Sequence, residues 1–198
     1  MADFEIINGV AIIPEGTTEI GEYAFYNCKN LKSITIPNSV KEIGANAFEG
    51  CKSLTEITIP NLVTEIGESA FSGCENLKSI TIPNSVKKIG WGAFWGCENL
   101  KSITIPNSVK RIGSGAFEGC TGLTKIIIPN SVKKIEEDTF CDCKSLTEIT
   151  IPNSVTEIGE SAFEGCESLN TIYVTKGDCE RVKEMLPEEL HKLVKEME

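Results

Sequence analysis

The sequence of 198 residues contains one histidine, no long apolar run, and fewer basic than acidic residues. A membrane-spanning helix needs about 20 mostly apolar residues, so we expect no membrane insertion. Nineteen Lys and Arg against 29 Asp and Glu give a net charge of -10, which argues against a nucleic-acid binder, because affinity for phosphates needs positive charge. The N-terminus also lacks the basic and apolar regions of a signal peptide, so the chain as given is expected to have no targeting signal.

Sequence signatures of catalysis are missing as well. His191 is the only histidine and lies outside the cysteine-containing repeats, which leaves a Ser-His-Asp or Cys-His site without support. The sequence has no G-x-x-x-x-G-K-[ST], G-x-G-x-x-G or H-E-x-x-H motif. We therefore expect a non-enzymatic protein without a cofactor or metal.

Nine cysteines are present, and their spacing predicts a repeat protein. Seven of them recur every 23 residues, each three residues after a phenylalanine that recurs with the same period. These are Cys28, Cys51, Cys74, Cys97, Cys120, Cys143 and Cys166. Prolines from Pro14 to Pro152 follow the same period, and only Pro187 falls outside it.

The repeat starting at Leu31 begins with a short strand. In Leu31-x-x-Ile34-x-Ile36 the alternation places the isoleucines inward and the intervening Ser and Thr outward. Pro37 ends the strand because it has no N–H to donate to a neighbouring ladder. The Asn-Ser pair that follows is typical of a turn.

The second half of the repeat is predicted to return to the next strand through one or two short helical turns. Val40, Ile43, Ala47, Phe48 and Cys51 are spaced by three and four residues, which favours this interpretation. Gly44 would allow a bend between the turns. Copies begin every 23 residues up to Leu146 and stack into a parallel sheet, so apolar columns are buried between neighbours.

The pattern Leu-x-x-Ile-x-Ile-Pro-x-Ser-Val-x-x-Ile-Gly-x-x-Ala-Phe-x-x-Cys resembles the BspA-like leucine-rich repeat over residues 10–175. The resemblance implies a right-handed curved solenoid of the α/β class, rich in β-structure, with a parallel β-sheet on its concave face. It implies surface adhesion to host matrix proteins or to other cells, and hence a cell-surface or secreted location. It transfers no catalytic residue.

The two ends are expected to form caps. Asn8-Gly9 between apolar segments predicts an N-terminal β-hairpin. We assign residues 1–177 to the solenoid and 178–198 to a C-terminal helical cap. That helix would place five apolar residues on one face, namely Leu186, Leu190, Leu193, Val194 and Met197. The alternative is a dimerisation helix, so a monomer or a weak homodimer is expected.

The cysteine ladder is interpreted as structural, since parallel stacking keeps neighbouring thiols from converging and a buried cysteine behaves as a small apolar residue. Cys141 replaces Tyr, Glu, Ser or Trp of other copies and is a candidate free thiol. Together with Cys143 it gives a weak redox or metal signal. Cys179 is a second candidate free thiol. Free thiols fit a reducing compartment or burial in the core.

Three surfaces are candidates for binding. The first is the outward column of the sheet, although Thr also suits any exposed strand; its candidate residues are Thr58, Thr81, Thr104, Ile127 and Tyr173. The second is the pair Trp91 and Trp95, either a contact site or neutral drift. The third is a basic stripe, either a site for anionic glycans or an acidic protein, or a solvated face; it comprises Lys87, Lys88, Lys110, Arg111, Lys133 and Lys134.

These features favour a leucine-rich repeat module that binds an extracellular-matrix or cell-surface protein, or an anionic glycan. Two alternatives remain open at this stage. The close similarity of the copies is also typical of a structural or engineered scaffold without a natural ligand. An intracellular adaptor would fit the free thiols and the missing signal.

Overall fold

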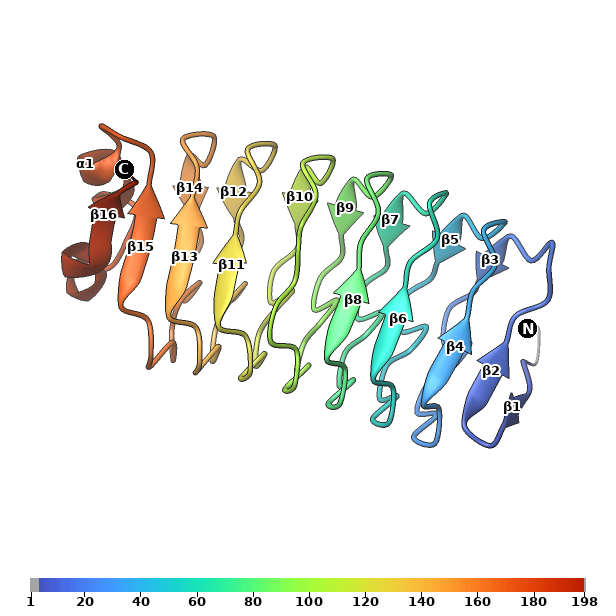
Figure 1. Ribbon diagram of the computed structural model, residues 1–198. Coiled ribbons are helices and arrows are strands. Elements are labelled where there is room, and N and C mark those ends of the chain that lie inside the picture. The colour runs from blue at the N-terminus through green and yellow to red at the C-terminus, as the bar shows by residue number, and fades with distance from the viewer. Residues whose placement is uncertain (1–3, 198) are drawn as a thin grey trace.

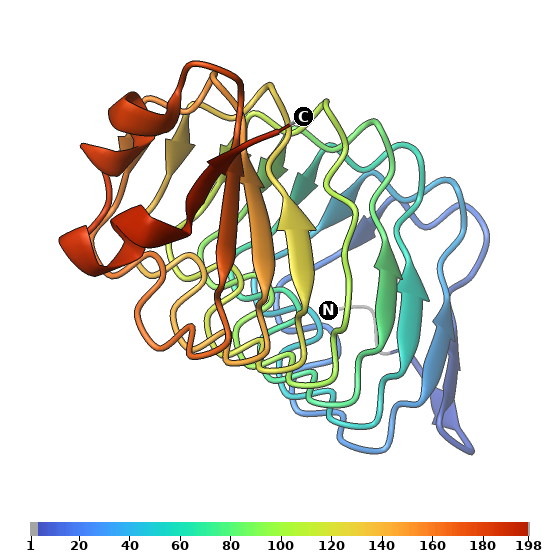
Figure 2. The same cartoon turned by 60° about the vertical axis from the view of Figure 1, so that its left-hand side comes forward.

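Each 23-residue repeat forms one coil of a solenoid, and successive coils stack from the N- to the C-terminus (Figure 1). The computed structural model describes residues 4–197. Two rows of short strands run along opposite sides of the coil, and a helical segment covers the C-terminal end (Figure 2). None of the helices within the described residues has the length and apolar composition needed to span a bilayer.

The first strand row contains the strands predicted from the Leu-x-x-Ile-x-Ile segment. Its members are β2 (Val10–Ile12), β4 (Ser33–Thr35), β6 (Glu56–Thr58), β8 (Ser79–Thr81), β11 (Lys125–Ile127), β13 (Glu148–Ile151) and β15 (Thr171–Val174). Paired strands are parallel and in register at 23 residues, as in Ile126 opposite Ile149. In the repeat beginning at Leu100 this row is reduced to a single parallel bridge, Ser102 with Lys125.

A second strand row replaces the helical turns expected in the other half of each repeat. It consists of β3 (Glu19–Ile20), β5 (Glu42–Ile43), β7 (Glu65–Ile66), β9 (Lys88–Ile89), β10 (Arg111–Ile112), β12 (Lys134–Ile135) and β14 (Glu157–Ile158). Five of these form one continuous ladder from β3 to β10. The helical prediction for this segment was therefore wrong.

The residues after each of these strands form a run of turns, here called the turn segment (residues 44–51 in the second repeat). Asn46 and Gly50 have φ angles of 55° and 70°, in the left-handed region that interrupts a helix. Their N–H groups donate to carbonyl oxygens of the next repeat, Asn46 to Glu68 at 2.8 Å and Gly50 to Ser72 at 2.8 Å. Hydrogen bonding between repeats therefore takes the place of bonding within a helix.

Gly44 has a different role from the predicted bend. A Cβ atom added there would lie 2.7 Å from the backbone nitrogen of Glu22 in the preceding repeat. Its backbone φ is not in the left-handed region. The glycine is thus explained by close approach of two backbones and not by conformational freedom.

The core is a set of continuous columns, as the periodic pattern predicts. Adjacent phenylalanine rings are stacked from Phe25 to Phe163, with centroids 5.2 to 5.8 Å apart. Leucine, isoleucine, valine and cysteine columns are buried beside them. Full burial of one large apolar side chain contributes about 1.5–3 kcal/mol, so each coil is stabilised mainly by its two neighbours.

The predicted N-terminal hairpin is confirmed. Strand β1 (Ile6–Ile7) pairs antiparallel with β2, and Asn8 and Gly9 both have positive φ in the turn. Phe4 stacks on Phe25 with centroids 5.4 Å apart and covers the first ring of the column. The hairpin and Phe4 therefore close the N-terminal end of the stack.

The C-terminal cap is confirmed as partly helical, but the single long helix is wrong. The segment contains α1 (Cys179–Lys183), a 3-10 helix (Glu188–Leu193) and strand β16 (Val194–Glu196), which pairs parallel with β15. Pro187 precedes the 3-10 helix and starts a new turn there. The pairing of β16 covers the edge of β15, which would otherwise be an unpaired edge at the end of the stack. The predicted ranges, 1–177 for the solenoid and 178–198 for the cap, include residues 1–3 and 198, which lie outside the described residues.

Candidate binding surfaces

Trp91 and Trp95 lie on the turn segment that follows β9 and are 59% and 50% exposed. Their backbones are fixed by the preceding repeat: the carbonyl of Trp91 accepts from the Ser69 N–H at 2.8 Å, and that of Trp95 from the Gly73 N–H at 2.7 Å. Rigid backbones thus hold two large, solvent-exposed indoles in one repeat. An exposed, rigidly held aromatic pair is typical of a contact site.

A tyrosine pair in the first repeat is a further candidate that the sequence did not indicate. Tyr23 and Tyr26 are half-exposed, and their rings meet edge to face with centroids 5.5 Å apart. Tyr23 has a φ of 55°, an unusual conformation for a bulky residue. The corresponding residues of later copies are Asn, Ser, Gly or Asp, which tolerate this region better. The contrast between Tyr23 and the small or polar residues of its column is the sequence feature that could have indicated this pair.

The outward column of the first strand row lies where the alternation placed it. Thr58, Thr81 and Thr104 are exposed, and Ile127 is 68% exposed on β11. Tyr173 differs, because β16 pairs beside it with Lys195 in register, and it is only partly exposed. The sheet therefore offers an accessible face from β4 to β13 that ends at the cap.

The same face is hollowed where the ladder is interrupted between β4 and β6. The hollow has a volume of about 550 Å³. Thr35, Thr58 and Thr81 line it together with Glu56 and the partly buried Ile34. Hydroxyl groups and one carboxylate give this region hydrogen-bonding capacity but little charge.

The basic stripe divides into two columns. In the column on the second strand row, Lys88 contacts Glu65 at 2.5 Å, and Lys134 contacts Glu136 at 3.1 Å and Glu157 at 2.7 Å. Hydrogen bonds to Glu157 and Glu136 raise the pKa of Lys134. Arg111 also lies 4.0 Å from Glu136. Half of the predicted stripe is therefore paired with glutamates.

The other column keeps its positive charge available. Lys87, Lys110 and Lys133 are exposed. Within residues 4–197 no carboxylate lies within ion-pair distance of their ammonium groups. These three side chains, here called the free lysine column, form the part of the stripe that can meet an anionic ligand.

The repeated cysteines are bonded to the backbone. The Cys97 thiol donates to the carbonyl oxygen of Phe71 at 3.2 Å, and the pattern recurs along the column, with Cys143 donating to Phe117 at 3.1 Å. Burial raises the pKa of these thiols, that of Cys120 to about 12. A buried, protonated and hydrogen-bonded thiol is a poor nucleophile, which agrees with a structural role.

Cys141 and Cys179 are both half-buried free thiols. Burial, followed by the charges of Asp142 and Glu118, raises the pKa of Cys141 to about 11, so its thiolate is scarce at neutral pH. The neighbouring Cys143 thiol is directed to a carbonyl. In the described part of the chain, no group of three or more His, Cys, Asp and Glu side chains is arranged to hold a metal ion.

Comparison with known proteins agrees with this geometry. A family model, described as the BspA type leucine-rich repeat region, matches residues 9–124 and 111–186 with six copies. The chain belongs to the BspA-type leucine-rich repeat family. No curated protein is significantly similar to it in sequence. Leucine-rich repeat folds are generally non-enzymatic, and the fold predicted from the repeats is confirmed.

Solved structures extend the likeness to named bacterial proteins. The Treponema pallidum leucine-rich repeat protein is 34% identical with a TM-score of 0.76, covering 82% of this chain and 78% of its own. A leucine-rich cell-surface protein of Faecalibacterium prausnitzii is 29% identical with a TM-score of 0.66, covering 89% and 62%. The pneumococcal vaccine antigen PcpA, at 22% identity and a TM-score of 0.67, shares the fold over 98% of this chain and 46% of its own.

Proposed function

We propose that this protein is a recognition module that binds a protein of the extracellular matrix or of another cell's surface. The observation that supports this most directly is the exposed pair Trp91 and Trp95. Tryptophan and tyrosine are enriched among the residues that dominate interface energies. The similarity to a leucine-rich cell-surface protein of F. prausnitzii supports an extracellular setting.

The rigidity of the turn segment supports the same conclusion. Because the backbone of each tryptophan is hydrogen-bonded to the preceding repeat, little backbone conformational entropy is lost when the indoles are buried by a partner. The repeat after it has Ser114 and Glu118 in the two tryptophan columns. The frame therefore does not require aromatic residues at these positions.

A second candidate is the binding of anionic glycans through the free lysine column. Lys87, Lys110 and Lys133 occur in three successive repeats, whose backbones are about 4.8 Å apart. Their side chains therefore present a line of positive charge. Sulfated sugars also present repeated anionic groups. Salt should weaken such binding strongly, which distinguishes it from contacts made by tryptophan.

The deciding experiment measures binding of the purified protein to fibronectin, fibrinogen and sulfated glycans by biolayer interferometry. Trp91→Ala/Trp95→Ala should raise the dissociation constant about thirtyfold or more, since loss of one interface hot spot costs about 2 kcal/mol of binding free energy. The matched control is Ser114→Ala/Glu118→Ala, which changes the same two columns one repeat later and should bind like the parent.

Thermal melting separates the outcomes. The melting temperature of the tryptophan variant should stay close to the parent value, because both side chains are exposed. Strong destabilisation would contradict the assigned exposure. Absence of saturable binding to every probe, with the fold intact, would favour the scaffold interpretation instead. An intracellular adaptor would be indicated by binding only to cytoplasmic partners.

A further inference from the structure

The turn segments are joined along the solenoid by a regular set of backbone hydrogen bonds. In each repeat before the last, three N–H groups, two residues apart, donate to three carbonyl oxygens of the next repeat. At the last of these interfaces the donors are Asp138, Phe140 and Asp142, and the bonds measure 3.2, 3.0 and 2.7 Å. Every internal turn segment is therefore paired on both sides.

The last turn segment has no such partner on its C-terminal side. The corresponding donors are Ser161, Phe163 and Gly165, and none of their N–H groups finds an acceptor among residues 4–197. A further repeat would supply the carbonyls of residues 183, 185 and 187. In the cap, the Lys183 carbonyl instead accepts from Leu186 and the Pro187 carbonyl from Leu190. The three donors, here called the open edge, are left as a template for another backbone.

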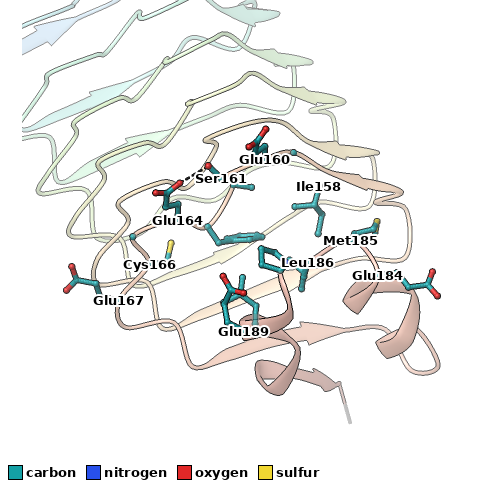
Figure 3. Close-up of a pocket in the computed structure, with 16 residues that line it drawn as sticks. Ile158, Glu160, Ser161, Glu164, Cys166, Glu167, Glu184, Met185, Leu186 and Glu189 are labelled. Atoms are coloured by element: carbon teal, nitrogen blue, oxygen red, sulfur yellow. Dashed lines mark hydrogen bonds between the residues drawn. The ribbon is translucent and has the colours of Figure 1, made fainter.

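A cavity of about 830 Å³ lies between the open edge and the cap (Figure 3). Phe163 and Cys166 line it on the side of the last repeat, and Met185, Leu186 and Leu190 line it on the side of the cap. Ligand pockets span about 300–1,000 Å³, so the space is large enough for a short peptide segment. The apolar lining favours burial of an uncharged side chain between the two walls.

The rim of this cavity is acidic. Glu160, Glu164, Glu167, Glu184 and Glu189 belong to the lining, which includes no lysine or arginine. Figure 3 shows their carboxylates spread around the cavity, with Ser161 donating a hydrogen bond to Glu164 at 2.7 Å. A ligand that enters here should carry positive charge at its edges.

We propose that the open edge binds a short, basic peptide segment of a partner protein. Carbonyls at alternate residues of the peptide would accept the three N–H groups, as those of the next turn segment do at each internal interface, so about five residues span the edge. An apolar side chain would lie against the partly buried Cys166 and Leu190, and Lys or Arg side chains would meet the glutamates. This site is independent of the tryptophan surface.

A second copy of this chain is a poorer occupant. Continuing the stack would require the first coil of that copy to lie on the last coil of this one. Strand β16 already pairs with β15 at that end, and Phe4 covers Phe25 at the other. Both caps would have to move before two copies could stack in register.

The direct test follows the three amides by nuclear magnetic resonance and hydrogen exchange. In the free protein, the amides of Ser161, Phe163 and Gly165 should exchange faster than the matched amides of Asp138, Phe140 and Asp142. Addition of acetyl-Lys-Leu-Lys-Leu-Lys-amide should shift and slow the first three in a saturable way. Equal protection in the free protein would overturn the open edge, and binding without any change at these amides would overturn the proposed mode.

Charge-reversal variants test the acidic rim. Glu160→Lys/Glu164→Lys should weaken the peptide's affinity about tenfold, because attraction becomes repulsion at the site. Glu49→Lys/Glu68→Lys makes the same change in the same two columns five and four repeats earlier. That control should alter affinity by less than about twofold, since at about 4.8 Å per repeat both charges lie well beyond a Debye length from the edge. Equal losses in both variants, or equal binding of acetyl-Glu-Leu-Glu-Leu-Glu-amide, would show nonspecific attraction and refute the proposal.

Discussion

The phenylalanine column allows a quantitative test of nearest-neighbour stability. Phe94 is fully buried and stacks on Phe71 at 5.5 Å and on Phe117 at 5.4 Å, whereas Phe163 stacks on one phenylalanine, Phe140, at 5.8 Å. A stacked aromatic pair contributes about 0.5–1.5 kcal/mol beyond its buried area. Phe94→Leu keeps most of the apolar burial and should cost about 1–3 kcal/mol, and Phe163→Leu about half of that.

Urea unfolding followed by circular dichroism measures these losses, with an unchanged m-value as the check that cooperativity is preserved. The double variant Phe94→Leu/Phe117→Leu shares one stack, so its loss should be smaller than the two single losses combined by about one pair energy. Phe48→Leu/Phe140→Leu are four repeats apart and should be additive. Equal losses at the centre and the end, or additivity in both pairs, would refute the stacking argument.

Other predictions concern the thiols, the cap and the lysines. Burial raises the pKa of Cys120 to about 12 from its ordinary value of 9.0. Its protonated thiol therefore stabilises the fold fully below pH 9, and this contribution is lost as the pH rises from 9 towards 12. The melting temperature should fall over that range, and it should fall less steeply for Cys120→Ala. Truncation after residue 177 removes β16, and light scattering should detect aggregation; a soluble monomer would show that the cap is dispensable. Lys87→Glu/Lys110→Glu should reduce retention on heparin more than Lys88→Glu/Arg111→Glu, whose side chains already face glutamates; the opposite order would reject the free lysine column.

The sequence was sufficient to predict the stack because a 23-residue period leaves little choice of architecture. Leu31, Ile34 and Phe48 recur in every internal copy, and a single coil cannot bury these side chains alone. Stacking in register follows from that requirement. Pro37 and Asn8-Gly9 then located the ends of strands, because proline lacks a donor and Asn-Gly favours positive φ.

The second strand row could not be predicted from the spacing of apolar residues. Val40, Ile43 and Ala47 meet the helical spacing, yet their segment pairs with neighbouring coils. Hydrogen bonds between residues 22 or 24 positions apart are invisible to a local pattern. The same limit applies to Leu190 and Val194, where pairing of β16 with β15 prevailed over a local helical preference.

A candidate site could be predicted from the sequence where its residues depart from an otherwise regular repeat column. Trp91 and Trp95 stood out because equivalent copies define the frame, and the structure places both at the surface. Tyr23 was hidden because its repeat is degenerate at other positions. The open edge depends on how the cap folds, and no repeat column contains that information.

Residues that differ from the rest of their repeat column fall into two groups, those that contact a neighbouring repeat and those that remain exposed. Lys88 departs from the glutamate of its column, but Glu65 in the preceding repeat binds it, so the change is compensated within the stack. Trp91 departs from its column in the same repeat and remains exposed. Lys87 does not depart, because Lys41, Lys110 and Lys133 occupy the same column. A substitution that the frame neither requires nor compensates leaves apolar area exposed to water, and under the proposed function contact with a partner would offset that cost. The tryptophan pair meets that criterion, whereas the paired lysines do not.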